Sequence, residues 1–184
     1  MKKKPNWLLI IGLSVGGLCL LGCIATAALT FFFPSIYHSA LENSSLSIGA
    51  PAPDFELTSL TGETIRLSQF QGRPVLLGMG ASWCPDCRAE APLLEELHQD
   101  HPELVILLVD SKETPEIVQA FVNEFDMTQP VLLDQDGTVF KLYQIVAIPT
   151  EVFIDKDGMI RAKLVETVTP ELLAEKLRLI GMDP

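Results

Sequence analysis

Residues 83–92 have the sequence WCPDCRAEAP, in which two residues separate Cys84 from Cys87. The apolar run at 74–79 predicts a buried strand before this stretch, and the pattern over 85–98 predicts a helix. The proline between the cysteines suits a first helical position, where its missing N–H needs no partner. Cys84 is therefore expected at a strand-to-helix junction. There, free backbone N–H groups and the helix dipole stabilise a thiolate.

The helical phase predicts different roles for the two cysteines. Cys87 begins a stripe with spacings of three and four residues, so it is expected to face inward, while Cys84 is expected to be exposed at the helix tip. The stripe consists of Cys87, Glu90, Ala91, Leu94 and Leu97. We therefore predict Cys84 as the attacking nucleophile, Cys87 as the resolving thiol, and a redox-active disulfide between them.

Glu90 lies on this stripe, about one turn after Cys87. A partly buried carboxyl group there would have a raised pKa and could exchange a proton with the Cys87 thiol. We therefore include Glu90 among the catalytic candidates. The alternative is that Glu90 points to solvent, as is expected of Glu95 and Glu96.

Two structural roles for the cysteine pair are less well supported. A structural zinc site needs four ligands, and only His98 and His101 lie near the pair in the sequence. A static disulfide across two residues would constrain very little unfolded chain. The pattern therefore favours a redox pair, and no metal or cofactor is expected.

From residue 51 onward, short strand-like runs alternate with helical patterns. Strands are expected at 64–67, 74–79, 104–110, 131–133, 150–154 and 159–165. Further helices are expected from 115 and from 170, the second ending at Gly181. Such alternation is typical of an α/β layer structure.

An almost unbroken apolar run at 7–33, with no charged residue inside it, follows three lysines and predicts one N-terminal transmembrane helix. We expect a cytoplasmic N-terminus at 1–6, a tether at 34–47 and a domain at 48–184. Because the next basic residue after the run is Arg66, the domain is expected outside the cytoplasm, at the cell membrane. Cleavage near 25–27, or lipidation of Cys23 in the lipoprotein-like stretch LLGC, remain as alternatives.

The net charge of the chain is −11, and it becomes −14 without the three N-terminal lysines. A nucleic acid partner is therefore disfavoured, because its phosphates would be repelled. Basic partners would be attracted, although solubility alone explains such a charge.

Four stretches resemble the thioredoxin superfamily, and more narrowly its membrane-tethered TlpA/ResA branch, which overlaps with the redoxin and alkyl hydroperoxide reductase group. They are GAPAPDF at 49–55, LSQFQGRP at 67–74, WCPDCRAEAP at 83–92, and IPT at 148–150 leading into FIDKDG at 153–158. The resemblance covers residues 48–181. It implies a thioredoxin-like fold with a central mixed β-sheet flanked by helices.

The resemblance also implies roles for individual residues. Pro149 corresponds to the cis-proline that faces the cysteine pair and, with Ile148, helps to hold a substrate strand. Trp83 corresponds to the aromatic residue beside the nucleophile, and Pro85 completes the expected substrate contacts. Glu90 matches the acidic residue of ResA-like sites. Thioredoxin itself has a buried aspartate in the strand before the motif, and spacing places Gly78 at that position.

Three functions follow as hypotheses. The first is an extracytoplasmic reductase of exported proteins, for which the resemblance suggests apocytochrome c as substrate and a membrane electron donor of the DsbD/CcdA type. The second is a redoxin-type peroxidase using Cys84, although Ala81 stands where peroxiredoxins have Thr or Ser. The third is a non-catalytic binding module, which the intact cysteine pair disfavours.

Overall fold

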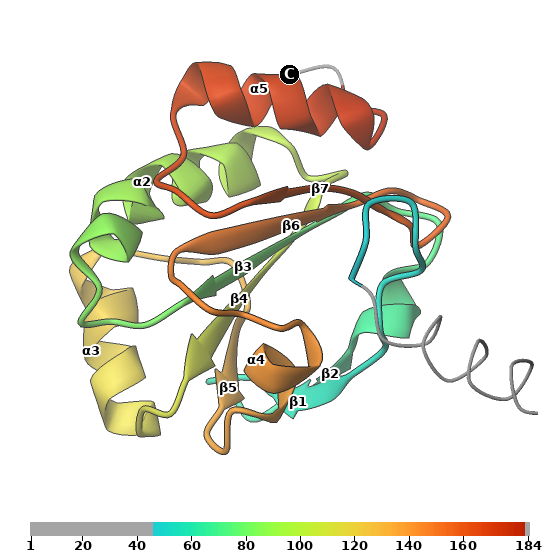
Figure 1. The fold of residues 1–184 in the computed structure, drawn as a ribbon. Helices are drawn as coiled ribbons and strands as arrows, with labels where there is room; N and C mark the ends of the chain where they lie inside the picture. The colour runs from blue at the N-terminus through green and yellow to red at the C-terminus, as the bar shows by residue number, and fades with distance from the viewer. Residues whose placement is uncertain (1–45, 183–184) are drawn as a thin grey trace, which may run out of the picture. The chain divides into compact units, whose positions relative to one another are not determined.

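The computed structural model describes residues 46–182, which are coloured in Figure 1. The predicted cytoplasmic N-terminus (1–6), the anchor (7–33) and all but the last two residues of the tether (34–47) lie outside the described residues. Within 46–182, no helix combines the length and apolar character needed to span a membrane.

A five-stranded mixed sheet forms the centre of the described domain, with the strand order β5-β4-β3-β6-β7 (Figure 1). Strands β5, β4 and β3 are parallel to one another, and β6 runs antiparallel to β3. Because β7 is antiparallel to β6, it runs in the same direction as the first three. The strands are β3 (Val75–Gly80), β4 (Val105–Ser111), β5 (Val131–Asp134), β6 (Thr150–Ile154) and β7 (Ile160–Leu164). The predicted thioredoxin-like α/β fold with a mixed sheet is therefore confirmed.

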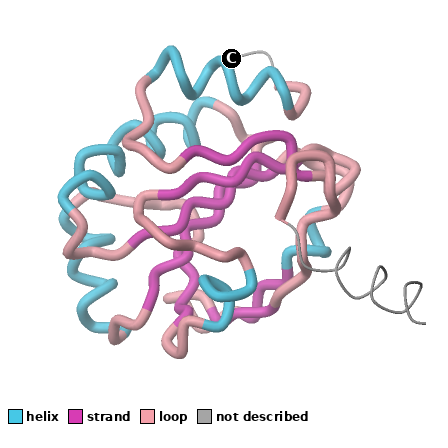
Figure 2. Tube along the Cα trace, viewed as in Figure 1, coloured by secondary structure: helices cyan, strands magenta, loops and turns pink. Residues whose placement is uncertain are grey.

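Helices cover both faces of this sheet (Figure 2). On one face, α2 (Pro85–Asp100) and α5 (Pro170–Leu179) pack over Leu76 and Phe153, and α3 (Pro115–Glu124) packs beside α2. On the other face lie the hairpin of β1 (Glu56–Thr58) and β2 (Thr64–Arg66), the 3-10 turn η1 (Leu67–Phe70) and α4 (Thr138–Leu142).

Successive residues of β3 serve opposite faces, as strand geometry requires. Leu77 and Met79 enter the cluster under α4, whereas Leu76 enters the cluster under α2 and α5. Gly78 and Gly80 share the face of Leu76, so the central strand offers no side chains beneath the first turns of α2. The cysteine pair lies over this part of β3, where the strand presents only glycines.

Helix α4 was not expected from the sequence because five residues are too few to establish a helical period. A buried side chain fixes it: the Asp134 carboxylate accepts the backbone N–H groups of Val139 and Phe140, at 3.1 and 2.9 Å. The Tyr143 hydroxyl, just after the helix, donates to the Pro53 carbonyl at 2.7 Å. These contacts fasten α4 to the sheet and to the start of the domain.

Candidate active site

The cysteine pair lies where α2 begins. Cys84 is the N-cap residue, and its Sγ accepts a hydrogen bond from the backbone N–H of Cys87 at 3.3 Å. Both cysteines are free thiols in this structure. The sulfur of Cys84 thus occupies the position in which a helix N-terminus stabilises negative charge.

The expectation that Cys84 is exposed is wrong. Its exposed fraction is 4%, compared with 7% for Cys87, so both thiols are buried. The reason is local: the Cys84 sulfur turns back over the first helical turn to reach the Cys87 N–H instead of projecting outward. Helical phase is therefore correct for Cys87, but it does not predict the exposure of a cap residue.

The environment nevertheless distinguishes the two sulfurs. Burial, followed by the hydrogen bond to Cys84, raises the pKa of Cys87 well above its ordinary value. Cys87 is thus held as a protonated thiol. Such an arrangement fits a resolving thiol, which needs a base before it can attack.

Gly80 lies directly beneath Cys87. A Cβ atom added at Gly80 would lie 3.2 Å from the Cys87 Sγ, closer than such atoms normally approach. At Gly78, an added Cβ would meet only Leu108 Cδ2, at 2.7 Å. The two glycines therefore serve as a matched pair for mutation. A side chain at Gly80 would contact the resolving thiol, whereas one at Gly78 would contact only Leu108.

We predict that Gly80→Ala displaces the Cys87 sulfur and slows closure of the Cys84–Cys87 disulfide by about threefold or more, since sub-ångström misplacement of reacting groups is costly. Gly78→Ala should leave the closure rate unchanged, because it displaces Leu108 only. Single-turnover oxidation of the reduced proteins measures both rates. Equal slowing in the two variants would contradict this assignment.

Glu90 is buried, with 5% of its surface exposed, so its alternative orientation toward solvent is excluded. The backbone N–H of Val168 donates to its Oε2 at 3.3 Å. Burial raises the pKa of Glu90, and that effect outweighs its hydrogen bonds. Glu95, which was expected to reach solvent, is also buried, because it accepts hydrogen bonds from Thr128 and Gln99.

Two further buried acids were not predicted. Glu151 in β6 has no exposed surface, and Asp110 at the end of β4 is 6% exposed. Burial, together with the neighbouring carboxylate of Glu113, raises the pKa of Asp110 to about 8. The sequence did contain a signal for these buried acids. Each is the acidic residue of a strand segment (VILLVDS or TEVFI) that is otherwise largely apolar.

A small pocket lies between α2 and the sheet, at the resolving cysteine. Cys87, Glu90 and Asp110 line it on its polar side, and its volume is about 40 Å³. That volume is sufficient for a water molecule. The resolving thiol therefore shares one confined, partly polar space with two carboxyl groups of raised pKa.

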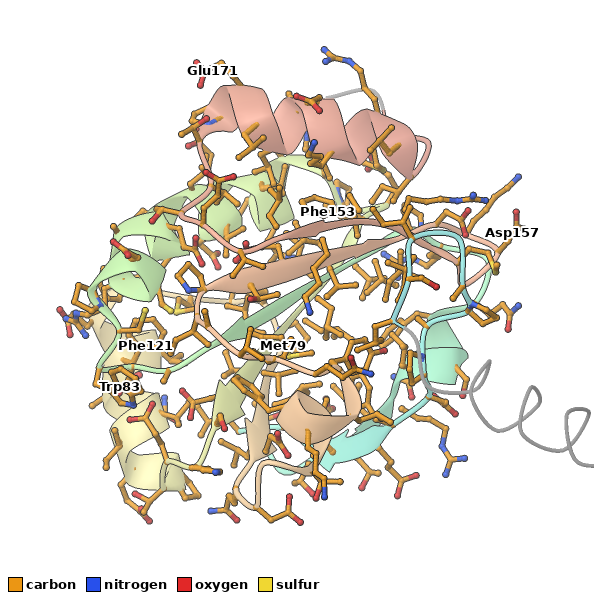
Figure 3. All side chains as sticks on the ribbon, in the orientation of Figure 1. Met79, Trp83, Phe121, Phe153, Asp157 and Glu171 are labelled. Carbon is orange, nitrogen blue, oxygen red and sulfur yellow. The ribbon has the colours of Figure 1, made fainter. Side chains whose placement is uncertain are left out.

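The expected substrate contacts lie on two segments. Trp83 projects at the surface just before α2, with 68% of its surface exposed, and Pro85 is also exposed (Figure 3). On the other segment, the Ile148–Pro149 peptide bond is cis. Because Thr150 pairs with Met79, Pro149 lies at the end of β3 that leads to the cysteines. Ile148 is half-buried, and Pro149 is buried.

Comparisons with known proteins agree with this architecture. Residues 48–163 match the AhpC/TSA family. The thiol-disulfide oxidoreductase ResA of Bacillus cereus is 35% identical over 159 residues, which cover 85% of this chain and 91% of that protein. ResA of Geobacillus kaustophilus is 32% identical, with 89% and 91% covered.

Solved structures show the same fold. A putative thiol:disulfide interchange protein DsbE from Chlorobium tepidum superimposes with a TM-score of 0.69 at 27% identity, covering 74% of this chain and all of that one. StoA from Bacillus subtilis gives a TM-score of 0.60 at 28% identity, covering 70% and 98%.

A thioredoxin-like sheet that carries a C-x-x-C pair at a helix N-terminus defines the class of thiol–disulfide oxidoreductases. Within that class, the chain belongs to the AhpC/TSA family, and its curated relatives are ResA-type thiol-disulfide oxidoreductases.

Proposed function

We propose that this protein is a membrane-anchored, extracytoplasmic reductase of disulfides in exported proteins. The observation that carries the direction of the reaction is the charge around the pair. Asp86 and Glu90 bring negative charge to the site, and no cationic side chain is among the groups that shift the pKa of Cys87, Glu90 or Glu151 in the described part of the chain. Oxidising members of the class stabilise their reduced form, whereas acidic surroundings oppose a thiolate and favour a reductant.

In the proposed reaction, the Cys84 thiolate attacks a substrate disulfide and forms a mixed disulfide, which releases one substrate thiolate. Cys87 then gives its proton to Glu90 and attacks the Cys84 sulfur. The Cys84–Cys87 disulfide forms, the second substrate sulfur leaves as a thiolate, and the substrate gains two electrons. Trp83, Pro85, Ile148 and Pro149 would contact the substrate segment.

The location and the partners are proposals that rest on the N-terminal sequence. Three lysines followed by the apolar run at 7–33 support a single membrane anchor with the domain outside the cytoplasm. A structurally similar Mycobacterium tuberculosis disulfide oxidoreductase is described as secreted. Apocytochrome c is the proposed substrate class, and a transporter of the DsbD/CcdA type is the proposed electron donor.

The decisive test is the reduction potential of the Cys84–Cys87 pair in the full-length protein. A value of about −230 mV or below would support a reductase. A value near about −120 mV would mean that the protein inserts disulfides instead.

Peroxide reduction by Cys84 is the weaker alternative. Ala81 supplies no hydroxyl group near the sulfur, and the curated relatives are named for disulfide exchange. Consumption of hydrogen peroxide by the reduced protein, lost in Cys84→Ser, would favour the peroxidase.

We predict that Glu90→Gln slows the resolution of a preformed mixed disulfide at pH 7 by about tenfold or more, because the proton acceptor for Cys87 is lost. The amide still accepts the Val168 N–H, so the fold should be retained. The measurement is release of a thiol from a mixed disulfide on Cys84 across pH 5 to 9. An unchanged rate and pH profile would remove Glu90 from the mechanism.

A further inference from the structure

Glu151 is a wholly buried carboxyl group that the mechanism above does not use. No N–H or hydroxyl group in the described part of the chain donates to either of its oxygens. Such a group is costly to bury unless it is protonated or paired. Its position within the central sheet, two residues after Pro149, places it at the site and not at the periphery.

Strand register shows which way Glu151 faces. It pairs with Gly78 in the antiparallel ladder of β3 and β6, and it therefore shares the sheet face that α2 covers. Gly78 contributes no side chain to that face of the sheet. Glu90 reaches this face from α2, and each of the two carboxyl groups shifts the pKa of the other, so they lie close enough to interact.

A hydrogen bond between two carboxyl groups requires a proton on one of them. Two charged carboxylates cannot share a buried site, so the pair holds one proton. The Val168 N–H favours the charged form of Glu90, whereas Glu151 receives no such donor. Burial and the neighbouring Glu90 both raise the pKa of Glu151. The proton therefore resides on Glu151, and the charge resides on Glu90.

The surrounding titratable groups do not change this assignment. From α2 and its cap, Asp86, Cys84 and Cys87 act on the pair, and Asp110 of β4 lines the pocket that Glu90 shares with Cys87. All of them are acids. From the segment between β7 and α5, only the Val168 backbone reaches Glu90 among the hydrogen bonds of the described residues.

We propose that Glu151 is a positioning residue of the disulfide exchange: as a neutral acid, it donates a hydrogen bond that keeps Glu90 a carboxylate next to the Cys87 thiol. This inference rests on the role proposed for Glu90. During resolution, Cys87 transfers its proton to Glu90, so that both acids are protonated while the Cys84–Cys87 bond forms and the substrate thiolate leaves. Reduction of the disulfide returns that proton to Cys87.

The test compares Glu151→Leu with Glu151→Gln in the full-length protein. Leucine removes the donor, so the pKa of Glu90 should rise, and resolution of a preformed mixed disulfide at pH 7 should slow by about tenfold. The pH profile of resolution should shift upward. Glutamine retains a donor and should stay within about threefold of the unmodified protein. Glu95→Gln, a buried glutamate of α2 bonded to Thr128 and Gln99, is the matched control and should not shift the profile.

The sign of the shift decides the proposal. If Glu151 were charged, its removal would favour the carboxylate of Glu90 and move the profile to lower pH, which would overturn the proposal, as would an unchanged profile. A leucine effect that persisted in the Glu90→Gln background would also overturn it, because Glu151 would then act without Glu90.

An NMR titration of ¹³C-labelled glutamate carboxyls keeps this test separate from the proposed function. Two coupled steps are expected in the unmodified protein and one in Glu151→Leu. Failure of the reductase proposal would leave this titration unaltered, whereas independent single steps for the two acids would overturn the pairing itself.

Discussion

Cys84→Ser is expected to abolish thiol–disulfide exchange, whereas Cys87→Ser is expected to leave the protein covalently attached to its substrate. The reason is the different placement of the two sulfurs. Cys84 accepts the first-turn N–H of α2 and can attack an external disulfide, while Cys87 is held as a thiol whose only task is resolution. Without Cys87, the mixed disulfide on Cys84 has no internal route to release.

The measurement is insulin or model-peptide disulfide reduction, together with non-reducing electrophoresis of protein mixed with a disulfide-bonded peptide. Activity should fall by at least about a thousandfold in both variants, since each removes a reacting atom. Only Cys87→Ser should accumulate a mixed disulfide. Accumulation in Cys84→Ser instead would reverse the two assigned roles.

Asp110→Asn is expected to stabilise the protein at alkaline pH. The folded protein holds the Asp110 proton up to about pH 8, whereas the unfolded chain releases it near the ordinary value of 3.8. The folded state thus binds more protons across this window, and the free energy of unfolding falls as the pH rises through it. For Asp110 alone, the loss is on the order of 5 kcal/mol between pH 4 and pH 8.

Denaturant unfolding of the reduced protein at pH 5, 6, 7 and 8 would measure this effect. The asparagine variant should lose less stability than the unmodified protein over this range, although Glu90 and Glu151 still contribute. Glu95→Gln provides a control of opposite sign. Burial pushes the pKa of Glu95 up, but hydrogen bonds from Thr128 and Gln99 outweigh it and leave that pKa low. Its variant should therefore be least stable, relative to the unmodified protein, at neutral pH. Parallel curves for Asp110→Asn and the unmodified protein would contradict the raised pKa.

The sequence predicted the strands and long helices because each carries a clear apolar period. Helix α2 was expected over 85–98 and spans Pro85–Asp100, and β6 was predicted with the bounds that the structure gives it. The short elements β1 and α4 were missed because their residues, ELT and TVFKL, carry no clear apolar pattern. Their stability comes from distant partners, as with Asp134 and the first turn of α4.

The chemistry of the site was predictable only along one segment. Cys87 and Glu90 share a helical stripe, so their burial followed from spacing. Glu151 and Asp110 reach the same region from other strands, and that meeting depends on strand order and register, which local pattern does not contain. The burial of Glu95 was missed for the same reason, since Thr128 comes from a loop beyond α3.

The face of β3 that carries Gly78 and Gly80 affects how this active site could be moved to another protein. The nucleophile and the resolving thiol lie in one contiguous segment of the chain. The acids that act on them come from three elements around Gly78 and Gly80, namely α2, β4 and β6. Grafting residues 83–92 onto a thioredoxin scaffold would carry over the two sulfurs and Glu90 but leave Glu151 and Asp110 behind. Reactivity of the pair can thus be retuned from β4 or β6 while the cysteine segment itself remains unaltered.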